Sequence, residues 1–414
     1  MKLAIIGTGI SGLGAAYLLH NSFDITLYEK NAYVGGHSRT ISVSVSGRKI
    51  PVDTGFIVFN NWNYPNLLGL FKEINVPYVN SDMSFGVSIN SNWLEYSSND
   101  LFAPRNILKP AYLGMMRDII KFNKQALAFI ERDPSVTLGQ CLDELKLGNW
   151  FRDYYLLAMG AAIWSCPLET ILKFPAQTFL RFFKNHGLLS INNRPQWYTV
   201  NGGSKEYVTR LTQGFSDRIK CNAGVVSVER ANDKWLIHDK TGAVETYDQV
   251  IFACHADEAM AMLKSPSKII QEVIGAFSYQ ENKIVVHSDR SFMPKRQKSW
   301  ASWIYLSDKR IDTEPTVSLS YWMNNLQPLD TDEQIFVTLN PGRRPKEDAI
   351  HDEHVFAHPV FDGPAIKAQA RLDEVQGKDG LWFCGAYQRY GFHEDGLLSA
   401  VNVVKKMGGR IPWE

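Results

Sequence analysis

The chain has 414 residues, of which 45% are hydrophobic and 21% charged, and its formal net charge is +1 at pH 7. This composition is that of a globular protein and excludes extended disorder. The balanced charge argues against nucleic acid as the main partner. One core rarely grows to this length, so we expect two domains.

The cysteines and the apolar stretches indicate the compartment. The five cysteines lack CxxC spacing, so they predict neither a metal site nor a disulfide framework and fit a reducing environment. The sequence begins with a core-like strand and shows no secretory signal. The longest uncharged apolar stretch, 154–168, falls short of the ~20 residues of a spanning helix. We expect a cytoplasmic protein with at most peripheral membrane contact. The cysteines are Cys141, Cys166, Cys221, Cys254 and Cys384.

The N-terminal segment has the layout of a dinucleotide-binding βαβ unit. An apolar strand, 2–6, runs into Gly7, Gly9 and Gly12, a helix follows, and a second strand closes at Glu29. Gly7 permits a tight turn, Gly9 lets the backbone approach a pyrophosphate, and Gly12 lets the helix pack closely on the strand. Amides at the helix start face the phosphates, and Glu29 accepts hydrogen bonds from a ribose. The unit alone does not choose between FAD and NAD.

Two later segments favour FAD. Gly35 and Gly36, followed by polar and cationic side chains, suit a ligand that extends past the first turn, although a hairpin turn explains the same pair. Near the C-terminus an apolar strand ends at Gly385, and Gly396 lies where the last helix starts. A strand end beside a helix N-terminus can stabilise negative charge on the pyrimidine edge of a flavin. The sequence therefore predicts an extended FAD site built from both ends of the chain.

The cofactor segments are separated along the chain, which predicts a discontinuous organisation. We expect an α/β fold in which residues 1–80, 196–270 and 371–414 form a Rossmann-type FAD-binding domain. Residues 81–195 and 271–370 then form a substrate domain of helices and a mixed or antiparallel sheet. The elements expected are helices over 111–132 and 150–164, strands over 284–287, 300–305, 316–322 and 334–339, and a β-meander over 224–229, 234–239 and 249–253.

Residues 176–193 carry an aromatic and aliphatic cluster. These side chains either line an apolar substrate tunnel or belong to an ordinary core, and the pattern leaves both interpretations open. The cluster consists of Phe179, Phe182, Phe183, Leu188 and Leu189.

Together these motifs resemble the FAD-dependent amine oxidase superfamily, which includes monoamine oxidases, protoporphyrinogen oxidase and carotenoid desaturases. Within it the chain looks like a bacterial subgroup of predicted NAD/FAD-binding proteins, often encoded beside cyclopropane-fatty-acid-synthase-like methyltransferases. The resemblance implies a lipid substrate and, as a partner, a lipid methyltransferase. It rests on the motifs above and on residues 53–55, 202–204, 225–228, 250–257, 321–324 and 392–396.

The motifs and the resemblance together assign a set of FAD contacts. Val225 matches a position that contacts the adenine through its backbone in the superfamily. Many members carry Gly-Gly-Arg where this chain has Gly35-Gly36-His37, so the phosphate partner stays open, with Arg39 available two positions later. The assigned contacts are Gly7, Gly9, Ser11, Gly12, Glu29, Lys30, Gly35, Gly36, His37, Ser38, Arg39, Gly55, Phe56, Val225, Gly385, Ala386, Glu394, Asp395, Gly396 and Leu397.

Candidates for catalysis are few, because a flavin carries the redox chemistry itself. Lys283 resembles by context the lysine that amine oxidases place near flavin N5, or it is an ordinary strand-edge lysine. His255 follows a buried strand and His393 stands at the expected flavin edge, where each either shuttles a proton or fixes a loop. For Glu394 we favour a hydrogen-bonding role over that of a base.

The leading hypothesis is an FAD-dependent oxidoreductase acting on a hydrophobic substrate. It would oxidise, desaturate or isomerise a compound such as a phospholipid fatty-acyl chain by hydride transfer to the flavin. Amine oxidases carry an acidic residue where this chain has Ala386, which makes an amine substrate less expected. Two alternatives remain: a flavin amine oxidase that produces aldehyde and peroxide, and an FAD-binding partner of a lipid methyltransferase without turnover of its own.

Overall fold

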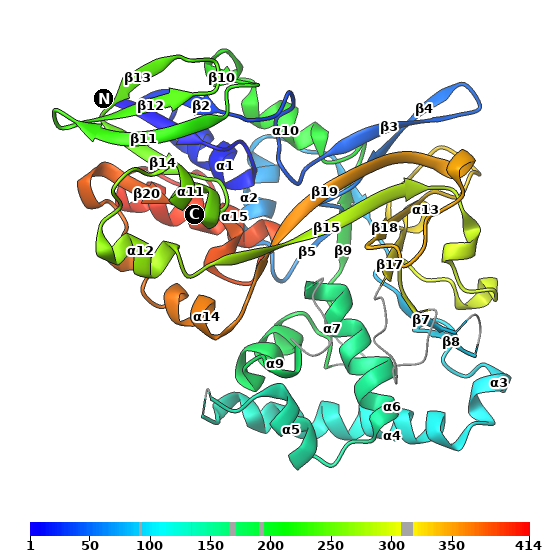
Figure 1. Cartoon of the computed structure of the whole chain (residues 1–414). Coiled ribbons are helices and arrows are strands. Elements are labelled where there is room, and N and C mark those ends of the chain that lie inside the picture. The colour runs from blue at the N-terminus through cyan, green and yellow to red at the C-terminus, as the bar shows by residue number, and fades with distance from the viewer. Residues whose placement is uncertain (91–92, 134, 165–170, 190–193, 308–317) are drawn as a thin grey trace.

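The computed structural model describes residues 1–414 except 91–92, 134, 165–170, 190–193 and 308–317. Cys166 and the first two residues of the strand expected over 316–322 lie outside the described residues. Figure 1 shows a sheet with covering helices at the upper left, a larger sheet on the right and a group of helices below. The predicted α/β class is confirmed.

A five-stranded parallel sheet is the centre of the first part. The central residues of its long strands are apolar and buried, as expected when both faces are covered, and polar residues such as Lys2 and Asp24 stand at the strand starts. Leu3 and Ile5 pack with α1 and α15 on one face, whereas Ala4 and Ile6 pack with a three-stranded antiparallel sheet and α11 on the other. In spatial order the strands are β10 (Ile219–Lys220), β2 (Asp24–Tyr28), β1 (Lys2–Ile6), β14 (Gln249–Phe252) and β20 (Leu381–Phe383).

The elements around this sheet come from distant parts of the sequence. The antiparallel sheet forms the meander expected after residue 224, although its third strand, β13, was not predicted and the expected third strand is β14 of the parallel sheet. The elements are β11 (Val225–Ala231), β12 (Lys234–Asp239), β13 (Val244–Tyr247), α1 (Ile10–Leu19), α2 (Pro65–Glu73), α10 (Lys205–Thr212), α11 (Ala256–Met262), α12 (Lys268–Ile274), α14 (Gly363–Gln369) and α15 (His393–Lys406).

A seven-stranded sheet forms the second part. All its neighbouring strands are antiparallel except β16 and β7, so the predicted mixed or antiparallel sheet is present. The two longest strands, β15 and β19, pair from Ser278 with Val360 to His287 with Ile350. The spatial order is β19 (Ile350–Val360), β15 (Ser278–His287), β18 (Phe336–Leu339), β17 (Ser318–Trp322), β16 (Trp303–Ser307), β7 (Phe85–Ile89) and β8 (Leu94–Ser97).

The helices below this sheet bury a second apolar core. The helix expected over 111–132 is α-helical only to Gln125 and continues as a 3₁₀ turn over Ala126–Glu131. The helix expected over 150–164 is interrupted by a π-turn, Arg152–Leu156. The helices are α3 (Pro104–Ile107), α4 (Pro110–Gln125), α5 (Leu138–Glu144), α6 (Asn149–Phe151), α7 (Leu157–Trp164) and α9 (Ala176–Asn185).

Small elements connect the two parts. The hairpin of β3 and β4 follows the second glycine pair, and β9 returns the chain from the helices to the parallel sheet. Among the described residues, no helix is long and apolar enough to cross a bilayer. The remaining elements are β3 (Thr40–Val45), β4 (Arg48–Asp53), β5 (Phe59–Asn60), β6 (Tyr78–Asn80), β9 (Trp197–Val200) and α13 (Met323–Leu326).

Candidate functional site

The first glycine turn is packed so tightly that two of its glycines have no alternative. Gly7 has a φ of +104°, and a Cβ there would lie 2.6 Å from the carbonyl oxygen of Ala253. A Cβ at Gly12 would lie 2.0 Å from the carbonyl oxygen of Gly7. Gly9 differs, because an added Cβ would meet no heavy atom of the described residues within 4 Å. Of these three glycines, therefore, Gly9 is the one whose backbone a ligand can approach.

The second glycine pair lies against this opening. The Gly35 amide donates to the Thr8 carbonyl at 3.0 Å, which ties the two turns together. A Cβ on Gly36, whose φ is +57°, would lie 3.1 Å from the Gly9 Cα. No described side chain caps the first turn of α1, so its amides remain available to an anion. Gly9 and Gly36 therefore form two backbone walls of one cradle, which suits a pyrophosphate.

Glu29 lies at the end of β2, beside the cradle. Its buried carboxylate accepts the Thr8 hydroxyl at 2.5 Å and the Asn31 amide at 2.8 Å. A carboxylate has about four acceptor positions, so it retains capacity for a ribose hydroxyl. Val225 starts β11 close by, since the Ala223 amide donates to the Glu29 carbonyl. Lys30 points instead to Glu258, with which it forms an exposed ion pair at 2.5 Å.

The residues after Gly36 are held by the chain itself. Ser38 is hydrogen-bonded to Tyr207, and the Phe56 amide donates to the His37 carbonyl at 2.8 Å. Arg39 forms a bidentate pair with Asp352 of β19, at 2.8 and 3.1 Å. The guanidinium expected near a phosphate is therefore neutralised by a carboxylate from the second sheet.

Gly55 packs against the same turn. A Cβ added there would lie 2.3 Å from the His37 carbonyl oxygen. A larger residue would displace the turn that carries His37. We therefore assign Gly55 to the packing of this wall rather than to a polar contact.

The C-terminal segment reaches the same place from the other side. The Gly385 amide donates to the Ser399 hydroxyl at 2.8 Å, which fixes the loop that begins after β20. A Cβ on Gly396 would lie 2.9 Å from Ile10 and 3.0 Å from the Ser11 hydroxyl. The starts of α15 and α1 therefore touch, and the two predicted halves of the site meet. Ala386 lies in the short turn after Gly385, and Leu397 packs on Gly14.

The two acidic residues of α15 stabilise loops. Glu394 accepts the Leu67 amide at 2.9 Å and the amide and side chain of Asn66, so it caps α2. Burial raises the pKa of Glu394 to about 7. Asp395 accepts the Tyr390 and Phe392 amides, and burial raises its pKa to about 6. The contacts of Glu394 agree with the hydrogen-bonding role favoured for it.

His393 is embedded between Phe56 and Tyr207. Its ring stacks on Phe56 with centroids 3.8 Å apart, and its Nε2 lies 2.7 Å from the Tyr207 hydroxyl. Burial lowers the pKa of His393 to about 3, so the ring is neutral at physiological pH. These contacts support the role of fixing the loop.

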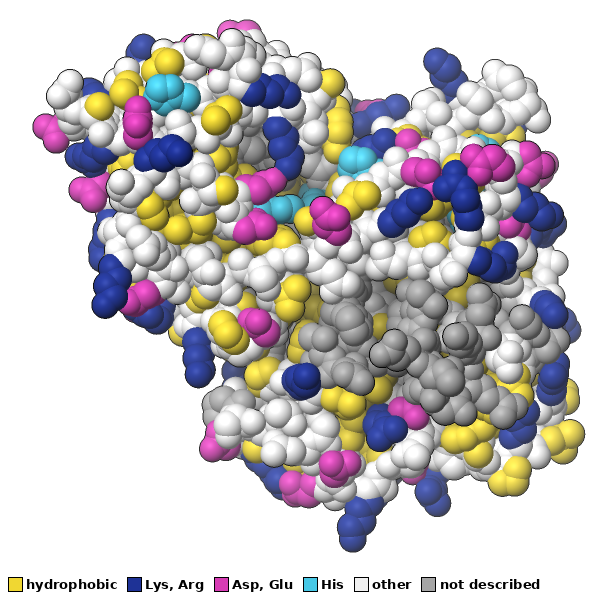
Figure 2. All heavy atoms as spheres, in the orientation of Figure 1, with side chains coloured by type: hydrophobic (Ala, Val, Ile, Leu, Met, Phe, Trp, Pro, Cys, Tyr) yellow, Lys and Arg dark blue, Asp and Glu magenta, His cyan; other side chains and the backbone are white. Residues whose placement is uncertain are grey.

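A cluster of half-buried histidines adjoins the cradle, next to Gly36. The rings of His37 and His358 lie 5.3 Å apart and those of His37 and His255 6.4 Å apart. Burial lowers the pKa of all three, that of His358 to about 4. Figure 2 shows histidine side chains in the hollow between the two parts of the molecule.

Asn282 determines the tautomer of His358. Its side-chain nitrogen lies 2.8 Å from His358 Nδ1 and 3.2 Å from the Gln280 carbonyl, and its oxygen accepts from Asn340. The amide is therefore the donor, and the neutral ring carries its proton on Nε2. His358 presents a defined N–H donor in a low-dielectric cluster.

Lys283 lies at the surface. Although its neighbour Asn282 is fully buried, the Lys283 side chain is 49% exposed and pairs with Glu353 at 3.0 Å. Successive residues of a strand point to opposite faces, so Lys283 points away from the histidine cluster. We give it no catalytic role below.

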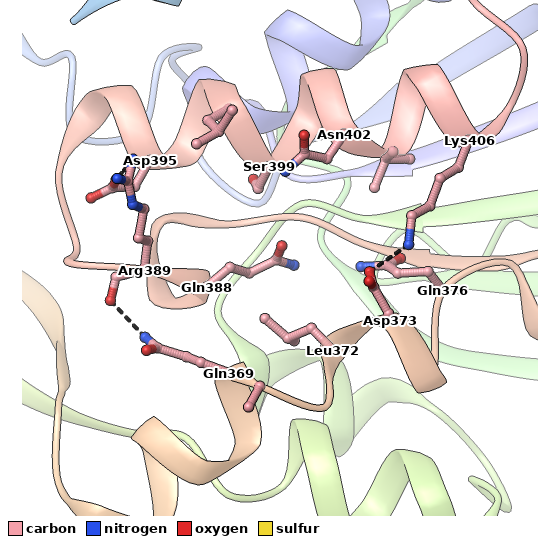
Figure 3. Close-up of a pocket in the computed structure, with 13 residues that line it drawn as sticks. Gln369, Leu372, Asp373, Gln376, Gln388, Arg389, Asp395, Ser399, Asn402 and Lys406 are labelled. Carbon is pink, nitrogen blue, oxygen red and sulfur yellow. Dashed lines mark hydrogen bonds and ion pairs between the residues drawn. The ribbon is translucent and has the colours of Figure 1, made fainter. Parts of the chain in front are cut away.

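A separate cavity of about 230 Å³ lies along α15. Its lining is rich in amide side chains, including Gln376, Gln388 and Asn402, and Figure 3 shows them between α15 and the segment around Leu372. The opposite face of α15 packs on α1 through Leu397. This cavity is thus on the other side of α15 from the glycine cradle.

Comparison with known proteins agrees with this geometry. A family model described as flavin containing amine oxidoreductase matches residues 10–407. The chain belongs to the flavin-containing amine oxidoreductase family. Members of this family are FAD-dependent oxidoreductases, which confirms the predicted cofactor, the enzyme class and the resemblance to the amine oxidase superfamily. The glycine cradle, the uncapped α1 and Glu29 are the features of this chain that fit FAD.

The curated relatives share about a quarter of their aligned residues with this chain and are longer proteins. This chain is similar to flavin-containing amine oxidase A from Canis lupus familiaris, with 24% identity over 272 residues, 61% of this chain and 48% of that protein. The same protein from Equus caballus gives the same identity and coverage. The chain thus spans about half the length of the curated relatives that it matches.

Solved structures show the same fold over nearly the whole chain. The CLA-producing fatty acid isomerase from P. acnes aligns with a TM-score of 0.69 at 15% identity, covering 98% of both chains. Cyclohexylamine oxidase from Brevibacterium oxydans IH-35A aligns with a TM-score of 0.70 at 14% identity, covering 98% of this chain and 99% of that one.

The sequence alone did not identify the residues that the second sheet contributes to the histidine cluster beside the cradle. His358 and Asn282 lie on β19 and β15, and neither belongs to a short motif. A weak signal was present, because His354, Phe356 and His358 alternate with period two in a stretch of β-type residues. Pairing of β15 with β19 brings Asn282 opposite Phe356, which no local pattern reveals.

Proposed function

We propose that this oxidoreductase oxidises, desaturates or isomerises a hydrophobic substrate such as a phospholipid fatty-acyl chain. FAD, when bound, supplies the hydride acceptor. The observation that carries the proposal is a continuous aromatic cluster that runs from the helices to the loop in front of α15. Trp164 contacts Phe182 at 4.8 Å, and Phe182 stacks on Phe392 at 5.1 Å between ring centroids.

This cluster connects the predicted substrate region to the cofactor region. Phe392 immediately precedes His393, and Tyr390 also contacts Phe182, at 5.9 Å. An acyl chain gains about 0.8 kcal/mol for each methylene moved from water into such surroundings. An ammonium group would lose its hydration there, and both neighbouring carboxylates, Glu394 and Asp395, already accept backbone amides.

The residues of the chain would position the substrate and control protons. Phe182 is buried in the core, so the substrate would lie against the partly exposed Tyr390 and Phe392, whose rings would exclude water from an apolar chain. The His358 Nε2–H is a donor with a fixed orientation. The lowered pKa values of His37 and His255 beside it keep these rings neutral, so they would serve as hydrogen-bonding groups rather than as strong bases. A lipid methyltransferase is proposed as the partner that acts on the same class of acyl chain.

Oxidation of an amine is the second candidate. It is favoured by the similarity to the canine amine oxidase A and by the fold shared with cyclohexylamine oxidase. The histidine cluster, whose members are neutral because their pKa values are lowered, would then add no positive charge that repels an amine.

Anaerobic mixing of the FAD-loaded protein with detergent-dispersed substrates separates these functions. Unsaturated phospholipids or their free fatty acids should bleach the visible flavin absorbance or yield an isomer detected by mass spectrometry. Bleaching by primary or cyclic amines alone would contradict the lipid proposal and support the second. If neither class reacts, and the protein copurifies with a methyltransferase, it serves as a binding partner without turnover.

A further inference from the structure

Exposed apolar side chains are concentrated on one face of the helical part. Six of the twelve large hydrophobic side chains exposed among the described residues fall between positions 102 and 127. Phe102 is 78% exposed and Leu108 82%, and they flank the short helix α3. Isolated apolar side chains are normal on a protein surface, but a contiguous group marks an interaction site.

The helix that follows in the chain, α4, carries the next exposed apolar side chains. Leu113 and Ile120 are about half exposed, at 51% and 52%, and Leu127 follows in the 3₁₀ turn after the helix. Arg117 and Lys124 lie between them, at spacings of three and four residues that place all five on one side of a helix. We call this surface the α3–α4 face; it consists of Phe102, Arg105, Ile107, Leu108, Leu113, Arg117, Ile120, Lys124 and Leu127.

The face carries a local excess of positive charge. Residues 101–130 include five basic side chains and one acidic one, whereas the whole chain is nearly neutral. The acidic residue, Asp118, is only 4% exposed and accepts the Gly148 amide; its other oxygen lies 3.3 Å from the guanidinium of Arg117, whose side chain remains 80% exposed. In the part of the chain that the structure describes, no carboxylate pairs with Arg105 or Lys124. Figure 2 shows hydrophobic and basic side chains gathered over this region at the lower right.

We propose that the α3–α4 face docks on the surface of an anionic lipid bilayer. A helix that lies in a membrane interface presents large apolar side chains interleaved with Lys and Arg. The apolar side chains enter the boundary between headgroups and acyl chains, and the Lys and Arg side chains contact anionic headgroups. A protein partner would have to pair each interleaved cation, whereas a fluid layer of anionic headgroups adapts to them. The docking surface does not depend on which substrate the flavin oxidises.

Cosedimentation of the FAD-loaded protein with vesicles tests the docking. Binding is expected to vesicles of phosphatidylglycerol and phosphatidylcholine, to fall with added salt because salt screens the charges, and to be weak on phosphatidylcholine alone. The double variant Phe102→Ser/Leu108→Ser should bind at least roughly tenfold more weakly, since each side chain contributes more than 1 kcal/mol when buried. Replacing Lys124 by Gln should cost about fivefold.

The matched control is Val226→Ser/Val244→Ser, which removes two exposed apolar side chains from β11 and β13 and should leave vesicle binding unchanged. Flavin content and thermal unfolding verify that each variant is folded. Equal binding of the Phe102/Leu108 variant and the parent would overturn the proposal. So would light scattering that shows a dimer of this chain, dissociated by the same variant, with no vesicle binding. Flavin reduction in detergent, the test of the proposed function, is independent of both results.

Discussion

A methyl group added at Gly9 separates cofactor binding from folding. The Gly9 backbone, with φ of −69° and ψ of −179°, is accessible to alanine, and its Cβ would meet no described heavy atom within 4 Å. An alanine at a helix N-cap costs roughly 0.5–1 kcal/mol relative to glycine, and the reduced freedom of the unfolded chain returns about 0.4–1 kcal/mol. The midpoint of thermal unfolding of the apoprotein should therefore move by no more than about 3 °C.

The same methyl group would occupy the cradle in which Gly36 approaches Gly9. When FAD is bound, the methyl group would overfill the contact between the Gly9 backbone and the cofactor. Overfilling of this kind costs about 1–3 kcal/mol, which weakens FAD binding by roughly 5- to 150-fold. Titration of the apoprotein with FAD, followed by quenching of flavin fluorescence, measures this loss.

Gly12→Ala is the matched comparison for Gly9→Ala. Its Cβ would lie 2.0 Å from the Gly7 carbonyl oxygen, so it should destabilise the apoprotein itself. Unchanged FAD affinity in Gly9→Ala would refute the reasoning, and so would a loss of affinity that is accompanied by unfolding.

The remaining predictions concern single side chains. Lys283→Met should change the rate of flavin reduction by less than about twofold, because the lysine is on the surface. A hundredfold loss of rate would instead support a catalytic lysine near flavin N5. His358→Gln should retain FAD but slow reduction at least roughly tenfold, measured by stopped flow. The depressed pKa of His358 means that the folded chain loses stability as pH falls from 6.5 to about 4, and the same variant should reduce that loss in denaturant titrations. Glu394 behaves oppositely: between pH 4.5 and about 7 the folded chain binds the extra proton, so its contribution to stability falls by up to about 3 kcal/mol as pH rises. Glu394→Gln should reduce this slope and leave the part that comes from Asp395, whose pKa burial raises to about 6.

The cofactor half of the site was predictable because the contacts that define it form between residues close together in the sequence. Gly7, Gly12 and Glu29 act within one βαβ unit, and the structure shows the contacts that force glycine at the first two. Joining this unit to Gly396 required knowledge of the family layout, since the contact with Ile10 spans almost the whole chain.

The substrate half was predictable only in outline. Four strands of the large sheet were recognised by their β-branched and aromatic residues, but β19 was missed because its first half is a run of histidines and acidic residues, 351–354. Pairing of β15 and β19 buries Asn282 and exposes Lys283, and a shift of one residue would reverse them. No periodicity in the sequence specifies that register. The sequence therefore suggested Lys283 as a catalytic candidate and gave no sign that Asn282 is the buried residue of the two.

The spectrum and amount of flavin released on denaturation test the central claim most directly. Purified protein is loaded with FAD, freed of excess by gel filtration, and then unfolded. We predict the absorbance of one FAD for each chain, and a much smaller amount from Gly9→Ala treated in the same way. Release of no flavin from the parent protein after loading would contradict the assignment of the cradle and the account built on it.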